Sequence, residues 1–97
     1  MTTNKFSELF NTIIQRSKSN IKDSYTKKLL KSGSKNIAQK FGEESAELII
    51  DYLKGSKKRT IEEAVDVIYH LFVMLHSKKI SYKDIEKELL KRKNVRR

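Results

Sequence analysis

Apolar residues recur every three or four positions along most of this chain, and no stretch alternates apolar and polar side chains for long enough to predict a strand. The sequence contains no proline and only three glycines, so few residues would interrupt a helix. Ninety-seven residues is the length of one domain. We therefore predict a single all-α domain over residues 1–97, folded as a four- to five-helix bundle.

Capping and stop residues divide the chain into the expected helices. A first helix covers about residues 3–18, and the polar segment 17–23 forms a loop. Two long helices, about 34–54 and 60–77, are joined by a turn over 55–60 and should lie antiparallel because that turn is short. The basic tail 93–97 is expected to fray. The predicted N-caps are Ser24, Ser34, Thr60 and Ser81, with Gly33 and Gly55 as stops and Asp84 completing the Ser81 cap.

The charge balance predicts an anionic partner. Lys and Arg number 22 against 12 Asp and Glu, a net charge of +10, which suits nucleotide phosphates, nucleic acid or an acidic membrane surface. The alternative is that the lysines only solvate the helices. Cysteine is absent, which excludes disulfides and thiolate metal sites. No apolar run is long enough to cross a bilayer and no signal peptide is evident, so we expect a soluble cytoplasmic protein.

Negative charge is nevertheless concentrated in the first long helix, where three glutamates fall within five residues. On a helical wheel Glu44 lies at the border of the apolar face, Glu47 lies one turn further, and Glu43 points more toward solvent. A carboxylate at such a border is costly to desolvate unless positive charge meets it. The apolar face is formed by Ile37, Phe41, Leu48 and Tyr52.

The second long helix also carries acids in an apolar setting. Residues 61–76 are apolar around nearly the whole circumference, which predicts a buried helix. Glu63, Asp66 and His70 form a polar seam along it at spacings of three and four. Two acids on a buried helix require partners.

If the two acid pairs face each other, Glu44, Glu47, Glu63 and Asp66 converge. Four carboxylates favour a hard divalent cation, Mg²⁺ or Mn²⁺, over zinc, which prefers nitrogen and sulfur. Helix bundles hold metals in this way. Mg²⁺ so bound usually completes its shell with water and substrate phosphates, so the pattern predicts a phosphate-bearing ligand.

Structural roles are the alternative for each residue. Thr60 and Glu63 fit a capping box, so Glu63 could only cap its own helix. Asp66 could pair with a lysine across the bundle, and His70 could be a core histidine or one that supports a ligand. The glutamates at 43–47 could form a solvated face beside Lys40.

Three short sequences carry a resemblance to a known family. They are SYT at 24–26, KFGEESAE at 40–47 and EEAVDVIYH at 62–70. Together they resemble the phosphoribosyl-ATP pyrophosphohydrolases of histidine biosynthesis, over about residues 6–92. The wider all-α, MazG-like superfamily of nucleoside triphosphate pyrophosphatases shares only the E-x-x-E and E-x-x-D pairs, so the flanking words favour the histidine-pathway branch. Some relatives are fused to a cyclohydrolase, whereas this chain resembles the stand-alone form.

The resemblance implies Mg²⁺-dependent hydrolysis of phosphoribosyl-ATP to phosphoribosyl-AMP and pyrophosphate. It implies that Glu44, Glu47, Glu63 and Asp66 hold the metal, in agreement with the helical wheel. Either Glu47 or Glu43 would accept the proton of the attacking water, and the sequence does not choose between them. Relatives by resemblance assemble as dimers or larger, and the apolar circumference of residues 61–76 also predicts a homodimer.

Lysines that precede the acid motif are the expected phosphate contacts. Residues 24–26 are expected to hold a phosphate or ribose, with a helix cap as the alternative. The predicted substrate-binding residues are Ser24, Tyr25, Thr26, Lys28, Lys31, Lys35, Lys40 and His70.

Three rival functions remain open from the sequence. A house-cleaning nucleoside triphosphate pyrophosphatase would use the same acids with another base pocket. A basic helical nucleic-acid-binding module would bind in a strongly salt-dependent way, but no recognition-helix signature supports it. A structural homodimer would leave the buried acids unexplained.

Overall fold

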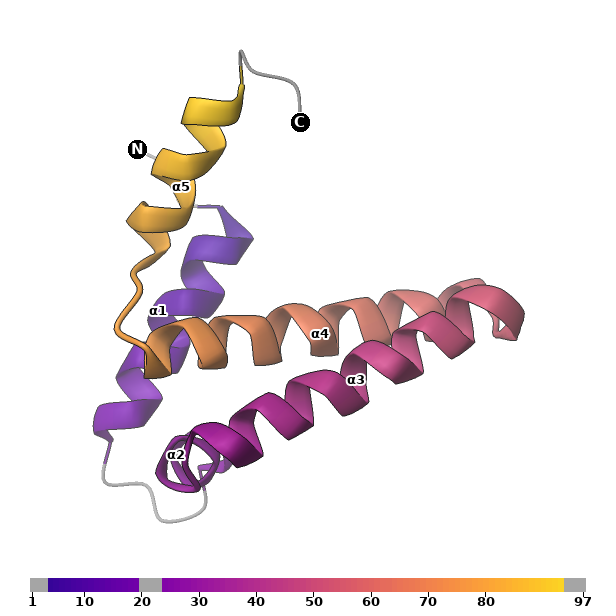
Figure 1. Ribbon diagram of the computed structural model, residues 1–97, viewed down its shortest axis with the longest axis horizontal. Helices are drawn as coiled ribbons and strands as arrows, with labels where there is room; N and C mark the ends of the chain where they lie inside the picture. The colour runs from indigo at the N-terminus through magenta and orange to yellow at the C-terminus, as the bar shows by residue number, and fades with distance from the viewer. Residues whose placement is uncertain (1–3, 20–23, 94–97) are drawn as a thin grey trace.

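The computed structural model describes residues 4–19 and 24–93 and contains five α-helices and no strand within those ranges (Figure 1). The all-α prediction is therefore confirmed for this part of the chain. Residues 20–23 of the predicted loop and 94–97 of the predicted frayed tail lie outside the described residues. In chain order the helices are α1 (Lys5–Lys18), α2 (Tyr25–Lys31), α3 (Ser34–Lys54), α4 (Lys57–Ser77) and α5 (Tyr82–Arg92).

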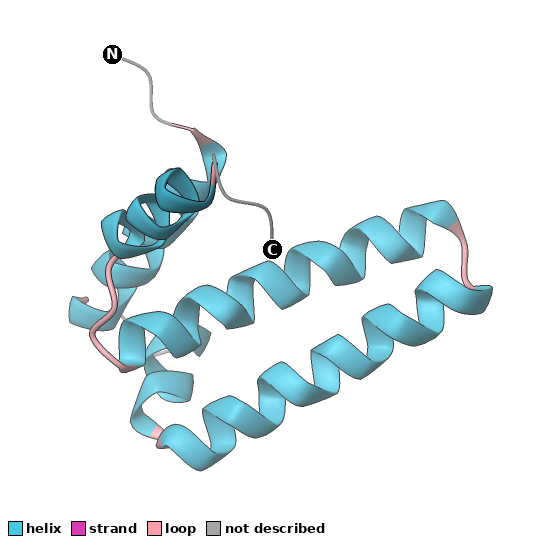
Figure 2. Ribbon diagram, turned by 45° about the horizontal axis from the view of Figure 1, so that its top comes forward, coloured by secondary structure: helices cyan, strands magenta, loops and turns pink. Residues whose placement is uncertain are grey.

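Helices α3 and α4 form a long antiparallel hairpin, as expected from the short connection (Figure 2). The connection is shorter than predicted, only Gly55 and Ser56, because Ser56 rather than Thr60 is the N-cap. The Ser56 side chain accepts a hydrogen bond from the Arg59 backbone N–H at 3.1 Å. The predicted capping box of Thr60 and Glu63 is therefore wrong, since both residues lie inside α4.

Of two further N-caps predicted from the sequence, one is present in the structure and the other is not. The Ser81–Asp84 capping box is present at the start of α5. Ser34, by contrast, is the first residue of α3 rather than its cap. Gly33 takes the cap position with φ 97° and ψ 164° and offers no side chain to the helix. This backbone conformation is essentially restricted to glycine, so Gly33 sets the turn between α2 and α3.

The hydrophobic core lies at one end of the hairpin, where α2 packs on the start of α3 and α1 packs on the C-terminal half of α4 (Figure 1). Phe10 of α1 contacts Phe72 of α4, with ring centroids 5.1 Å apart, and Tyr82 at the start of α5 contacts both rings. Such tilted and edge-on pairs are favourable beyond their buried area. The buried apolar residues are Phe10, Ile13, Leu29, Ile37, Phe72 and Val73.

The predicted complete burial of residues 61–76 is wrong for the chain as described. Ile61 and Val65 are each 55% exposed, and Tyr52 of the expected apolar face of α3 is 75% exposed. The physical reason is that α1, α2 and α5 all lie toward the other end of the hairpin (Figures 1 and 2). No helix in the described part of the chain is both long and apolar enough to cross a membrane.

Candidate metal centre

Three carboxylates meet between α3 and α4. Glu44 projects from α3, while Glu63 and Asp66 project from α4 one turn apart. One carboxylate oxygen from each lies within 4.8 Å of the others, a spacing at which one cation can contact all three. Glu63 is buried, Glu44 is partly buried and Asp66 is exposed, so the group is open to solvent on one side.

Glu63 is the most unusual of the three side chains. The residue is only 3% exposed. Its Oε2 accepts a hydrogen bond from Arg59 Nη2 at 2.6 Å, whereas its Oε1 is buried with no hydrogen-bond partner among the described residues. A buried polar atom without a partner is costly. An unpaired oxygen on one member of a group of three carboxylates suits a cation ligand.

The pKa of Glu44 reflects the negative charge of the neighbouring carboxylates. Burial raises the pKa of Glu44, and repulsion from Glu47 raises it further. Glu63 and Asp66 contribute smaller shifts in the same direction, while His70 opposes them. Mutual repulsion among carboxylates is what a bound divalent cation would relieve.

The two candidate bases differ in their surroundings. Glu47 is exposed and stands outside the group of three, although its charge still acts on Glu44. Glu43 is exposed as well, and Gln39 Nε2 donates to its Oε2 at 3.0 Å. That hydrogen bond is the main cause of the lowered pKa of Glu43, and Lys40, 3.6 Å away, lowers it further. Glu43 is therefore a weaker base than an isolated glutamate.

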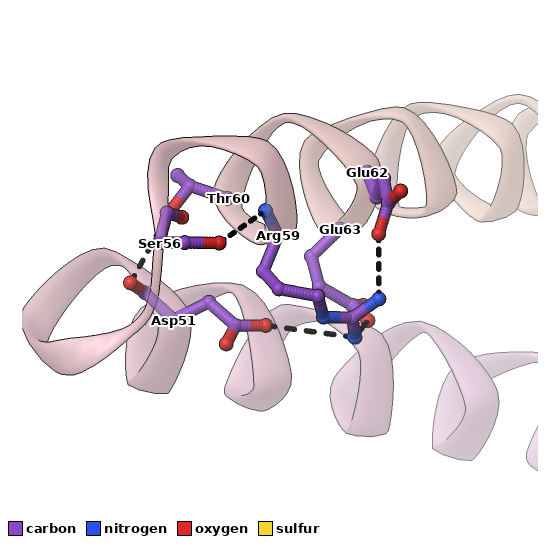
Figure 3. A network of polar contacts seen from close by, with 6 residues as sticks. All are labelled: Asp51, Ser56, Arg59, Thr60, Glu62 and Glu63. Carbon is purple, nitrogen blue, oxygen red and sulfur yellow. Dashed lines mark hydrogen bonds and ion pairs between the residues drawn. The ribbon is translucent and has the colours of Figure 1, made fainter.

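Arg59 is a residue of this region that the sequence analysis did not single out. Its guanidinium donates from Nη1 to Glu62 Oε1 at 2.7 Å and from Nη2 to Glu63 Oε2, and Asp51 lies 3.8 Å from Nη2 (Figure 3). The spacing of three and four residues from Arg59 to the two glutamates was the available signal. It was hidden because residues 55–60 were expected to form a turn rather than the first turn of a helix.

A second polar cluster joins α2 to α4. His70 Nδ1 lies 2.8 Å from the backbone oxygen of Asp66, which can only accept, so Nδ1 is the donor. In the neutral ring Nε2 then accepts a hydrogen bond from the Tyr25 hydroxyl at 3.1 Å. The Thr26 hydroxyl bonds to that of Tyr69, and Ser24 caps α2 by accepting from the Lys27 backbone N–H. The motif at 24–26 thus fixes α2 onto the turn of α4 that follows Asp66.

The model of the family described as phosphoribosyl-ATP pyrophosphohydrolase matches residues 6–93. This chain belongs to that family. The match covers every helix that contributes to the acid cluster and to the α2–α4 contact. The resemblance drawn from the three short motifs is therefore confirmed at the level of the family.

Proteins named as bifunctional are among the curated proteins that are similar to this chain. The chain is 45% identical over 92 residues to the histidine biosynthesis bifunctional protein HisIE of Staphylococcus epidermidis. The aligned stretch covers 95% of this chain and 44% of that protein. The chain is 41% identical over 88 residues to the protein of the same name from Staphylococcus aureus, covering 91% of this chain and 42% of that protein. The chain thus spans less than half the length of these curated relatives.

The lysines expected to contact substrate lie on the surface near the junction of α2 and α3. Lys28 and Lys31 are on α2 and Lys35 is in the first turn of α3; all three are exposed. None of these three lysines forms an ion pair with another described residue. Lys40 differs, since it lies beside Glu43. The covered end of the hairpin therefore carries three lysines that have no ion-pair partner among the described residues.

Proposed function

We propose that this chain hydrolyses phosphoribosyl-ATP between the α- and β-phosphates, giving phosphoribosyl-AMP and pyrophosphate, as the second step of histidine biosynthesis. The family match over residues 6–93 carries this assignment. Histidine biosynthesis also appears in the names of the bifunctional relatives.

We further propose that the reaction requires Mg²⁺, with Mn²⁺ as a substitute, held by Glu44, Glu63 and Asp66. The donor set fits, because all three residues offer carboxylate oxygens, and Glu63 has a buried oxygen without a hydrogen-bond partner among the described residues. Glu47 is the proposed fourth ligand, one turn from Glu44. When bound, the ion would neutralise triphosphate charge and acidify a water.

Glu47 is our proposed acceptor of the proton from the attacking water. It is exposed and lies beside the three-carboxylate group, so a water at that group could reach it. Glu43 is less suited, because Gln39 and Lys40 already hold its carboxylate and lower its pKa. A carboxylate that binds metal through one oxygen keeps the other for a proton, so the two roles proposed for Glu47 are compatible.

The lysines at positions 28, 31 and 35 are the proposed contacts for the substrate phosphates, including the extra phosphate that distinguishes phosphoribosyl-ATP from ATP. Lys40 is a fourth candidate. Because their hydroxyls are engaged with protein atoms, we propose that Ser24 and Thr26 mainly orient α2 and its lysines. Tyr25 and His70 are proposed to contact the substrate next to Asp66.

The direct test measures pyrophosphate release from phosphoribosyl-ATP with Mg²⁺ and with chelator. We expect Glu44→Gln and Asp66→Asn each to lower the rate by about 100-fold or more, because a ligand of the metal is lost. The matched control is Glu86→Gln on α5, an exposed glutamate away from the site. Full activity of either site variant at saturating Mg²⁺ would refute the ligand assignment.

Substrate choice separates this proposal from a house-cleaning pyrophosphatase, because both would use the same acids. One charge-assisted phosphate contact contributes about 1.5–3 kcal/mol, or roughly ten- to 150-fold. Lys28→Ala should therefore reduce the preference for phosphoribosyl-ATP over ATP by about that factor. Similar kcat/KM values for phosphoribosyl-ATP, ATP and dCTP in the unaltered protein would favour the house-cleaning function.

We also propose that the chain forms a homodimer through the end of the hairpin that its own helices leave uncovered. Large apolar side chains gather there on both helices, and each is more than half exposed. Exposed apolar residues at this density mark interaction surfaces. The residues concerned are Ile49, Ile50, Tyr52, Leu53, Ile61 and Val65.

A further inference from the structure

Arg59 makes three acidic contacts near the turn of the hairpin. Its Nη1 bonds to Glu62 at 2.7 Å, its Nη2 bonds to Glu63 at 2.6 Å, and Asp51 of α3 lies 3.8 Å from Nη2 (Figure 3). The side chain is half exposed, whereas that of Glu63 is 5% exposed. Arg59 thus reaches from the surface to a buried carboxylate.

The two oxygens of Glu63 have different environments. Oε2 is held by the guanidinium, and Oε1 is buried without a hydrogen-bond partner among the described residues. A planar guanidinium that bonds one oxygen fixes the orientation of the carboxylate more closely than an ammonium can. Arg59 therefore holds one oxygen of the Glu63 carboxylate, and the other has no hydrogen-bond partner among the described residues. Glu63 is also one of the three carboxylates that approach one another between α3 and α4.

We propose that Arg59 is a positioning residue for the metal centre: by holding Oε2 of Glu63 it keeps Oε1 directed to a divalent cation. This inference rests on the metal site given under the proposed function. Groups that hydrogen-bond to metal ligands set their orientation, and losing one typically costs about 10- to 100-fold in metal affinity or activity.

Arg59 could instead oppose the cation, since both are positive. Its contacts argue against this effect. Glu62 and Asp51 bracket the same guanidinium, so its single positive charge is shared among three carboxylates. The repulsion felt by a cation is reduced accordingly, and orientation of Glu63 is the larger effect.

The experiment measures Mn²⁺ binding to the whole chain from the electron paramagnetic resonance signal of free Mn²⁺, without substrate. Arg59→Met should raise the Mn²⁺ dissociation constant by about 10- to 100-fold. Arg59→Lys should fall between it and the unaltered protein, because one ammonium cannot engage Glu62 and Glu63 as a fork. The matched control is Lys58→Met, which removes the same charge one residue away and should leave the constant unchanged.

A double-mutant comparison tests whether the effect passes through Glu63. In a Glu63→Gln background, Arg59→Met should cause little further weakening, because the carboxylate that it orients is gone. Circular dichroism verifies that each variant keeps its helices; if Arg59→Met unfolds, the same comparison is made with Arg59→Lys.

The outcomes separate the two claims. Unchanged or tighter Mn²⁺ binding by the folded Arg59 variants would overturn the positioning role while leaving the metal centre in place. Equal weakening with and without Glu63 would overturn it too. Absence of Mn²⁺ binding by the unaltered chain would overturn the metal centre itself and this inference with it.

Discussion

The two ends of the α3–α4 hairpin are built from similar helices but have different surroundings. At one end Ile37 and Val73 are 3% and 0% exposed under α1 and α2. At the other end, next to the turn, Leu53 and Ile61 are 72% and 55% exposed. The sequence of both ends is rich in apolar residues, so composition alone does not distinguish them.

The difference shows what an apolar helix face does and does not specify. Apolar periodicity indicates that a helix face is to be buried. Which part of that face is buried within the same chain depends on where the other helices of the chain pack. The acid cluster lies along the hairpin between these two regions. The hydrophobic core lies on one side of the cluster, at the covered end, and Arg59 contacts the cluster from the side of the open end.

Breaking the covered end should have the largest effect. Phe10 is 1% exposed and contacts Phe72 and Tyr82, so Phe10→Ala should lower the free energy of unfolding by about 3–5 kcal/mol. Phe6 is the control: it is 51% exposed, and Phe6→Ala should cost about 1 kcal/mol or less. Urea denaturation followed by circular dichroism measures both. Equal losses would mean that the core does not centre on Phe10.

Charging the open end should change assembly rather than folding. If a second copy covers this surface, Leu53→Glu should weaken the dimer by at least about 2 kcal/mol, near 30-fold in dissociation constant. Leu89→Glu on α5 is the control, since that leucine is also exposed but lies in another region. Light scattering over a range of concentrations reads out the mass. A monomeric unaltered chain at micromolar concentration would contradict the proposed dimer.

Replacing two glycines by alanine, one that caps α3 and one inside it, should have smaller and opposite effects on stability. Gly33 has φ 97°, so Gly33→Ala should destabilise the fold by about 1–3 kcal/mol. Gly42 lies inside α3, and a Cβ added there would meet no other part of the described chain within 4 Å, so Gly42→Ala should stabilise the helix by up to about 1 kcal/mol. Thermal unfolding measures both changes. If Gly42→Ala stabilises the protein but raises KM, substrate approaches the backbone there.

The smallest expected effect concerns charge repulsion in the acid cluster. The pKa of Glu44 is raised, so between its unfolded and folded pKa values the folded state binds more protons, and stability falls as pH rises through this window. In chelator, Glu44→Gln should remove this loss and stabilise the fold by about 0.5 kcal/mol at pH 7. Thermal unfolding at pH 4 and pH 7 measures it. A variant with the same pH dependence as the unaltered protein would contradict the assignment.

Much of the fold could be predicted from the sequence because helix signals are local. The Ser24 and Ser81 caps lie where the side-chain patterns put them. The prediction of Thr60 as an N-cap was wrong because Ser56, four residues earlier, is also a good N-cap residue and α4 begins directly after it. Competing caps so close together cannot be ranked from local pattern alone.

The candidate site was predicted less completely. Helical spacing suffices to bring together Glu44, Glu63 and Asp66, because each acid lies on the facing side of its helix. Glu47 stands outside this group. The contact of Arg59 with Glu63 could not be predicted while residues 55–60 were expected to form a turn, because Arg59 lies in the first turn of α4. The contact between Tyr25 and His70 joins residues 45 positions apart, which no local pattern reveals.

The three clustered acids lie within residues 44–66, on two helices joined by only two residues. Contacts this close in sequence require little loop closure, and helical proteins rich in such local contacts fold in microseconds to milliseconds. The cluster can therefore assemble early in folding, before α1 and α5 dock. We expect segments added before α1 or after α5 to leave the geometry of the acids intact, because α1 and α2 still cover the hairpin, so the same hairpin can serve in longer proteins.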